Sequence, residues 1–487
     1  AKLSHIIIVV FAVISVLGFI AYFFEGIGKY ATEILPWDLS VSWLGYDLTS
    51  ARGYALIICI LTALYTVKGG MHSVVATEVM QFIVMTIGCI GVGIVAYNAV
   101  TIEQLNAVIP RGWKELSFGW NLNLDWSDTP FPQVNKKIDG DGFTLFGGLF
   151  VLMVLKGILA SIAGPVPSYD MQRILAAKKP SEAAKMSFLT VAVLYIPRYF
   201  MVVGFTVLAL VYLGPEISAM GGTIDFEKIL PMTMNAHLPS GLKGIMLAGF
   251  LAAFMGTFAA FINAAPAYLV NDIYKKYINP GASDKKLVQL SIISSLILVC
   301  IGIVFGFNAG SLNSLILWLS SALYGGYVAA NVLKWVWWRF TGAGYFWGML
   351  FGLIASTVKL FFFSEYVDIF VFPLIFAFSL LGCVLGTYAT PLPNPDAVVA
   401  FYKQTKPWGF WGPVKASAMA NDPSFVPNTH FKRDGFNVLV GIVWQMAQLL
   451  IPVYFMIREN AQMVIWSAVF LGCSYLLKKY WWNTLED

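Results

Sequence analysis

Three ionisable side chains interrupt long apolar segments of this 487-residue chain, namely Glu78, Lys156 and Arg198. A charge at the centre of a lipid bilayer costs about 2.5–3.5 kcal/mol, so such residues usually serve ion or proton movement or pair with another charge. Lys156 lies in the middle of LFVLMVLKGILASIAG, whereas Glu78 and Arg198 lie near segment ends or a proline. A snorkelling or paired charge is therefore an equal alternative for those two residues. Lys156 is the candidate for cation or proton chemistry, with pairing to a neighbouring carboxylate as its alternative.

The segment 245–274 must position a second set of polar groups. It carries no charge before Asp272, and at about 1.5 Å per residue it crosses a hydrocarbon core roughly 30 Å thick. Thr257 and Asn263 offer oxygen atoms from its middle. Small residues recur at helical spacing, which lets another backbone come close: Gly249, Ala252, Ala253, Gly256, Ala260, Ala264 and Ala267. This pattern fits either a tight helix interface or an ion path.

The composition indicates an all-α polytopic membrane protein. Hydrophobic residues make up 58% of the chain and charged residues only 12%. The net charge of +5 is spread in short clusters between apolar segments, so we expect no nucleic-acid partner. The sequence has no H-E-x-x-H motif and no glycine loop preceding a lysine and a hydroxyl, so we expect neither an enzyme nor a bound cofactor.

Hydropathy predicts about 12 transmembrane helices. Their expected ranges are 6–24, 53–67, 73–100, 143–164, 187–213, 245–274, 287–307, 312–338, 345–363, 367–385, 438–456 and 463–477. Lysine and arginine gather in alternate loops, which predicts that both termini are cytoplasmic and that 101–142 lies outside, in a multi-pass protein of the inner (plasma) membrane. We expect a core at 1–390, a cytoplasmic linker at 391–435, and two further helices with a tail at 436–487.

Three motifs resemble the sodium:solute symporter family. They are KGGMHSVVATEVMQFIVMTIG (68–88), SYDMQRILAAKKPSEAAK (168–185) and AAFMGTFAAFINAAPAYLVNDIYKKYI (252–278). The resemblance implies a LeuT-type inverted-repeat fold with ion and solute bound near the midplane. It matches the first predicted helix to the third core helix, with the N-terminal core helices absent. We therefore expect a truncated or processed chain, or another membrane chain that supplies the missing helices.

The resemblance also implies site residues. The family's sodium site on the eighth core helix falls on the Ala253 carbonyl, Gly256 and Thr257, so one of two hydroxyls is missing and the site is degenerate. Asn263 is a possible substitute, and Lys156 is a candidate to replace part of the cation's charge.

The family's solute positions fall on side chains that cannot hydrogen-bond a sugar, namely Ala160, Ile162, Ala163 and Leu317. The acid of the fifth core helix is kept as Glu78, with Gln81 one turn on. The sequence therefore predicts sodium-coupled symport of a small organic solute that is not galactose-like, in contact with the lipid bilayer. The alternative is a transport-inactive scaffold or sensor subunit of a larger membrane complex.

Overall fold

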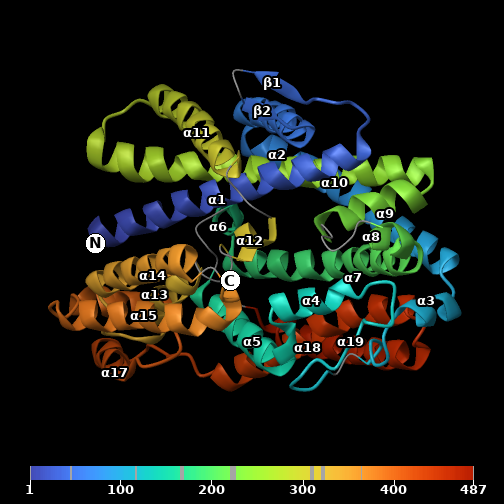
Figure 1. Cartoon of the computed structure of the whole chain (residues 1–487). Coiled ribbons are helices and arrows are strands. Elements are labelled where there is room, and N and C mark those ends of the chain that lie inside the picture. Colours follow the sequence, from blue (N-terminus) through green and yellow to red (C-terminus); the bar gives the residue numbers. More distant parts are fainter. Residues whose placement is uncertain are drawn as a thin grey trace. The chain divides into compact units, whose positions relative to one another are not determined.

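The structure is a computed structural model that describes residues 2–43, 46–115, 118–164, 169–219, 226–307, 312–317, 319, 324–363 and 365–485. It is almost entirely helical (Figure 1), with a short antiparallel pair of strands, β1 (Val41–Trp43) and β2 (Tyr46–Leu48). Among the described residues, ten helical stretches are long and apolar enough to cross a membrane. The predicted all-α polytopic class is therefore confirmed.

Most of the helices follow one another through short connections, whereas 35–49 and 109–132 are longer. They are α1 (Lys2–Ile34), α2 (Ser50–Ala99), α3 (Ile102–Val108), α4 (Gln133–Gly140), α5 (Phe146–Ala163), α6 (Tyr169–Ala176), α7 (Pro180–Tyr212), α8 (Gly214–Ala219), α9 (Ile229–His237), α10 (Ser240–Pro266), α11 (Asp284–Phe307), α12 (Leu312–Leu317), α13 (Tyr324–Val336), α14 (Gly342–Phe362), α15 (Asp368–Tyr388), α16 (Pro395–Thr405), α17 (Gly412–Asn421), α18 (Phe431–Met456) and α19 (Asn460–Tyr480). Short 3-10 turns lie at η1 (Phe143–Leu145), η2 (Phe226–Lys228) and η5 (Trp482–Thr484).

The chain forms two compact units, which we describe separately. Unit 1 contains Ala1–Tyr22, Leu145–Met171 and Ala264–Phe431. Unit 2 contains Phe23–Thr144, Gln172–Asn263 and Lys432–Asp487. Boundaries between the units fall inside α1, η1, α6, α10 and α18, so each of these elements contributes residues to both.

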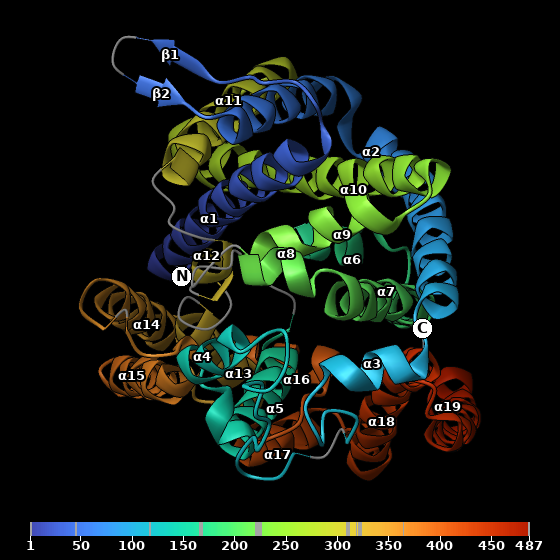
Figure 2. The same ribbon diagram turned by 45° about the vertical axis from the view of Figure 1, so that its right-hand side comes forward.

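Three predicted ranges differ in detail from the observed helices. The ranges 53–67 and 73–100 form one continuous helix, α2, whose two halves run in different directions (Figure 2). The range 312–338 contains α12 and α13, with residues 318 and 320–323 between them outside the described part. Hydropathy reports apolar content over a window and does not report whether the backbone hydrogen bonds continue. It therefore predicts neither the joining of 53–67 with 73–100 nor the division of 312–338 into two helices.

The long segment at 245–274 is helical as expected, but its winding changes at Pro266. From Ala267 to Ile278 the chain continues as a π-helix, η3, in which the Asn279 amide donates to the Tyr274 carbonyl five residues earlier (2.8 Å). Proline has no N–H to donate, so Pro266 interrupts the α-helical ladder, and the wider hydrogen-bond pattern follows it. π-helical segments are rare in proteins, and those that occur often lie at functional sites.

Glycines set the helix spacing in unit 1. A Cβ placed on Gly326 of α13 would lie 2.6 Å from the Gly352 carbonyl carbon of α14, so the two backbones touch. The Ser379 hydroxyl of α15 lies within hydrogen-bond distance of the carbonyl oxygens of Gly326 (2.8 Å) and Gly348 (2.9 Å). Helices α13, α14 and α15 are therefore joined at backbone level.

The segment after α15 is folded onto the end of α13. It contains α16 and α17, and between them Trp411 donates its indole N–H to the Trp335 carbonyl (2.8 Å). The Phe410 amide donates to the Val336 carbonyl (2.7 Å). The predicted linker at 391–435 is thus ordered and attached to unit 1, and its placement in the cytoplasm stays a prediction.

Candidate cation and solute sites

Helices α2 and α10 cross closely in unit 2. The glycines of each helix lie opposite long side chains of the other helix. Added Cβ atoms on Gly88 and Gly91 would lie 2.6 Å from Met246 Sδ and Leu242 Cδ1 respectively. Pairs with rising numbers on α2 meet falling numbers on α10, so the two helices run antiparallel. The predicted interface role of the small-residue row is therefore confirmed for its Gly249, where an added Cβ would lie 3.1 Å from Met85 Sδ.

The same crossing brings three predicted site residues together. A Cβ on Gly256 would lie 2.7 Å from Gln81 Oε1 and 3.5 Å from Glu78 Cγ. Glu78 and Gln81 lie three residues apart on α2, so they share one face of that helix. The side chains of an acid and an amide therefore occupy the space beside Gly256. This contact depends on the tertiary packing of two helices and could not be predicted from spacing along the chain.

The remaining predicted sodium ligands lie on the next turn of α10. The Thr257 hydroxyl donates to the Ala253 carbonyl at 2.9 Å. The Thr257 hydroxyl oxygen keeps its lone pairs after this bond and can still accept a cation, whereas the Ala253 carbonyl accepts this bond in addition to the helical bond from the Thr257 amide. Thr257 is half-buried and Ala253 is exposed. Asn263 is half-buried two turns beyond Gly256, about 10 Å along the axis, so it is further from this cluster than expected.

The chemistry of these groups suits a hard cation. They comprise a carboxylate, an amide oxygen, a hydroxyl and a backbone carbonyl, and oxygen ligands of these kinds are those that hard cations prefer. Within the described residues there is no cluster of three His, Cys, Asp or Glu side chains. We call Glu78, Gln81, Ala253, Gly256 and Thr257 the α2–α10 cluster.

The predicted solute residues lie on α5 in unit 1. Ala163 is buried and Ala160 is partly buried, and both pack into an apolar cluster with Phe11 and Tyr327. Ile162 is 43% exposed, so it does not share their face. Leu317 ends α12, and its side chain lies outside the described part of the structure. Two of the four predicted solute positions are thus brought onto one surface.

Aromatic side chains that the sequence analysis did not select line this surface. The rings of Phe11 and Tyr327 stack with centroids 4.8 Å apart, and the Phe11 and Tyr324 centroids are 6.3 Å apart. Tyr345 and Lys334 both donate to Asn331 Oδ1, at 3.2 and 2.7 Å. Tyr324, Tyr327 and Asn331 recur at positions i, i+3 and i+7 of an apolar helix, which is the signal that could have identified them.

Lys156 is half-buried one turn before Ala160. At the start of α15, Asp368 forms an ion pair with Lys359 of α14 (2.9 Å), and both partners are buried. The pairing of Lys156 with a carboxylate and its part in cation chemistry both stay predictions.

Comparisons with known proteins agree with this architecture. The family model "Sodium:solute symporter family" matches residues 4–352. Sodium/glucose cotransporter 4 of Danio rerio is 27% identical over 365 residues, which cover 71% of this chain and 53% of that protein. Human sodium/myo-inositol cotransporter 2 is 26% identical, over 62% of this chain and 46% of that protein. The chain thus spans about half the length of these relatives.

A solved structure also shares the fold. It is the substrate-bound outward-open state of a Na⁺-coupled sialic acid symporter, which aligns with a TM-score of 0.55 and 16% identity over 79% of this chain and 75% of that one. The alignment supports the LeuT-type fold that the motifs implied. Together with the family match over most of its length, this shows that the chain belongs to the sodium:solute symporter family.

Proposed function

We propose that the protein couples the transport of a small organic solute across the plasma membrane to sodium, and that the α2–α10 cluster binds the ion. The observation that carries this proposal is the approach of Gln81 Oε1 to the position of a Cβ on Gly256 (2.7 Å). The family resemblance places a hydroxyl at Gly256, and the amide of Gln81 supplies an oxygen next to that place. The degenerate site is therefore compensated from the neighbouring helix.

Each member of the cluster has a separate task in this proposal. The Glu78 carboxylate offsets the positive charge of the ion, and Gln81 replaces the missing hydroxyl. The Ala253 carbonyl and the Thr257 hydroxyl complete the oxygen ligands from α10. Because Thr257 already donates its proton to Ala253, its lone pairs are oriented away from that carbonyl and are available to the ion.

The predicted solute positions on α5 do not favour a polar substrate. Ala160 and Ala163 offer no hydrogen bonds, and the rings of Phe11 and Tyr327 that pack with them are buried and stack on each other. A sugar would lose hydrogen bonds to water on such a surface without regaining them, which is costly. We therefore propose a solute other than a galactose-like sugar, although the named relatives are sugar and inositol cotransporters.

Sodium binding can be tested without knowing the solute. Sodium that binds the folded protein raises its melting temperature, which choline does not. We expect the Gln81→Ala variant to lose this sodium-dependent shift and Gln289→Ala, an exposed residue of α11, to keep it. The double variant Gln81→Ala/Gly256→Ser exchanges the amide oxygen for a hydroxyl, so it should regain part of the shift.

The outcomes separate the two parts of the proposal. A wild-type protein without any sodium-dependent shift would exclude sodium coupling. A shift that persists in Gln81→Ala would exclude the role of Gln81 and leave sodium coupling intact. Sodium binding without uptake of any solute into proteoliposomes would instead favour the sensor or scaffold function, which the lack of polar groups at Ala160 and Ala163 also suggests.

A further inference from the structure

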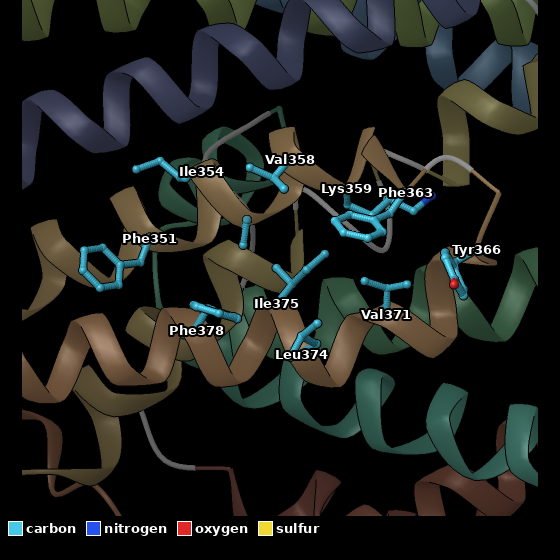
Figure 3. A pocket seen from close by; sticks show the side chains of 11 residues that line it. Phe351, Ile354, Val358, Lys359, Phe363, Tyr366, Val371, Leu374, Ile375 and Phe378 are labelled. Carbon is cyan, nitrogen blue, oxygen red and sulfur yellow. The ribbon is translucent and has the colours of Figure 1, made fainter. Parts of the chain in front are cut away.

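An apolar groove runs between α14 and α15 in unit 1, with a cavity volume of about 690 Å³. Ile354 and Val358 of α14 and Leu374 and Ile375 of α15 are among the residues that line it (Figure 3). Lys359 and Tyr366, its polar lining residues, lie near one end, away from Phe351 (Figure 3). The groove is thus apolar along its length with polar groups near one end.

The length of the groove corresponds to one leaflet of a bilayer. From Phe351 to Phe363 α14 rises about 18 Å, whereas half of the hydrocarbon core is about 15 Å. Helix α14 ends at Phe362 and α15 begins at Asp368, so the membrane surface lies at the end that contains Tyr366. Tyrosine is enriched at that level of membrane proteins, where its ring is in the lipid and its hydroxyl in the headgroup region.

The walls of the groove offer no charge to a ligand. Lys359 is neutralised by Asp368 at 2.9 Å. The apolar walls are accessible, because Ile354 is 52% exposed, Phe363 50% and Leu374 59%. Hydrocarbon can occupy such a groove without loss of hydrogen bonds, whereas a polar ligand cannot.

We propose that this groove binds one acyl chain of a bilayer phospholipid, whose headgroup lies at Tyr366. The chain extends along α14 and α15 toward Phe351 and Phe378, and it fills the space that the two helices leave between them. The groove shares no residue with the α2–α10 cluster or with the predicted solute positions on α5. It makes the lipid a specific ligand of unit 1.

Photo-crosslinking can test this site in the full chain, reconstituted into nanodiscs that contain phosphatidylethanolamine with a diazirine on one acyl chain. Mass spectrometry should locate crosslinks on the residues that line the groove. Leu374→Trp fills the groove, and we expect groove crosslinks to fall about tenfold, the change expected when roughly two methylene groups lose burial. Leu381→Trp is the matched control, since Leu381 is an exposed leucine two turns along α15 that does not line the groove.

Equal crosslinking of the two variants, or wild-type crosslinks spread evenly over the exposed faces of α14 and α15, would overturn the proposal. Crosslinks between two copies of the chain through this groove would also overturn it, because another protein chain would then be the occupant. If Leu374→Trp is not recovered as folded protein, Ile354→Trp on α14 fills the groove from the opposite wall. Its control is Leu360→Trp, an exposed position of α14 outside the groove.

Discussion

At the scale of single residues, Gln81 occupies the space that a side chain at Gly256 would need. The Gln81 amide oxygen lies 2.7 Å from the position of a Cβ on Gly256, so a side chain there requires this oxygen to move. Because the oxygen ends a flexible side chain, Gln81 can move, but it then leaves the place beside Gly256 that we propose for the ion. The double variant Gln81→Ala/Gly256→Ser avoids this competition, because it removes the amide when it adds the hydroxyl.

Asp38 provides a prediction for pH dependence. Its carboxylate accepts hydrogen bonds from the Ser40 amide (2.9 Å) and from the Ser50 hydroxyl, and these bonds lower its pKa to about 2. The folded pKa lies below the unfolded value of about 3.9, so the carboxylate stabilises the loop above pH 4 and this stabilisation is lost as pH falls toward 2.

Pepsin digestion measures this effect, since the enzyme is active in that pH range. We expect the Asp38→Asn variant to be cut within 35–50 faster than wild type near pH 4, and the two rates to converge near pH 2. Comparing both proteins at each pH removes the pH dependence of pepsin itself. A rate ratio that stays constant from pH 4 to pH 2 would show that the charge of Asp38 does not hold the loop.

At the scale of elements, Arg458 holds the end of α2. Its guanidinium donates to the carbonyls of Tyr97 (2.7 Å) and Val100 (3.2 Å) and lies 4.1 Å from the centroid of the Tyr97 ring. A cation at a helix C-terminus is also favoured by the helix dipole. Arg458 thereby fixes α2 to the end of α18.

We expect Arg458→Met to lose about 1.5–3 kcal/mol of stability, the value of hydrogen bonds to a charged donor. Thermal unfolding in detergent should show a lower melting temperature for this variant, an intermediate one for Arg458→Lys, and no change for the exposed control Arg111→Met. Equal melting temperatures of Arg458→Met and Arg111→Met would contradict this role.

Elements were largely predictable from the sequence, whereas their partners were not. Hydropathy located the apolar helices, and the row of small residues on 245–274 indicated a close crossing. The sequence could not show that α2 would be that partner, because Gln81 and Gly256 lie far apart in the chain. The pairing of Lys359 with Asp368 and the stacking of Phe11 on Tyr327 likewise depend on packing between elements. Local patterns carry information on helix faces but not on which faces meet.

At the scale of the whole molecule, topology depends on whether the segments 53–67 and 312–338 each cross the membrane. Between Lys136 and Lys415 lie the membrane-spanning helices α5, α7, α10, α11, α14 and α15, an even number. Helices α12 and α13 are each too short to span a membrane alone, because a span needs about 20 residues. If they form one span together, as the hydropathy predicts, the number becomes odd and the two lysines lie on opposite sides.

Cysteine labelling distinguishes these topologies. Lys136 and Lys415 are both exposed, so Lys136→Cys and Lys415→Cys are matched variants, made with the exposed Cys300 replaced by serine. If 53–67 and 312–338 each cross the membrane, as the hydropathy predicts, and both termini are cytoplasmic, we expect an impermeant maleimide to label Lys136→Cys in intact cells and Lys415→Cys only in inverted vesicles. A reporter fused after Asp487 should likewise be cytoplasmic.

Labelling of both variants in intact cells would mean that 312–338 does not cross, and that 391–435 lies outside the cell. Labelling of Lys136→Cys only in inverted vesicles, with a cytoplasmic reporter after Asp487, would mean that 53–67 and 73–100 together cross the membrane once, as one helix α2. The same labelling with an external reporter would reverse the orientation, against the charge bias of the loops.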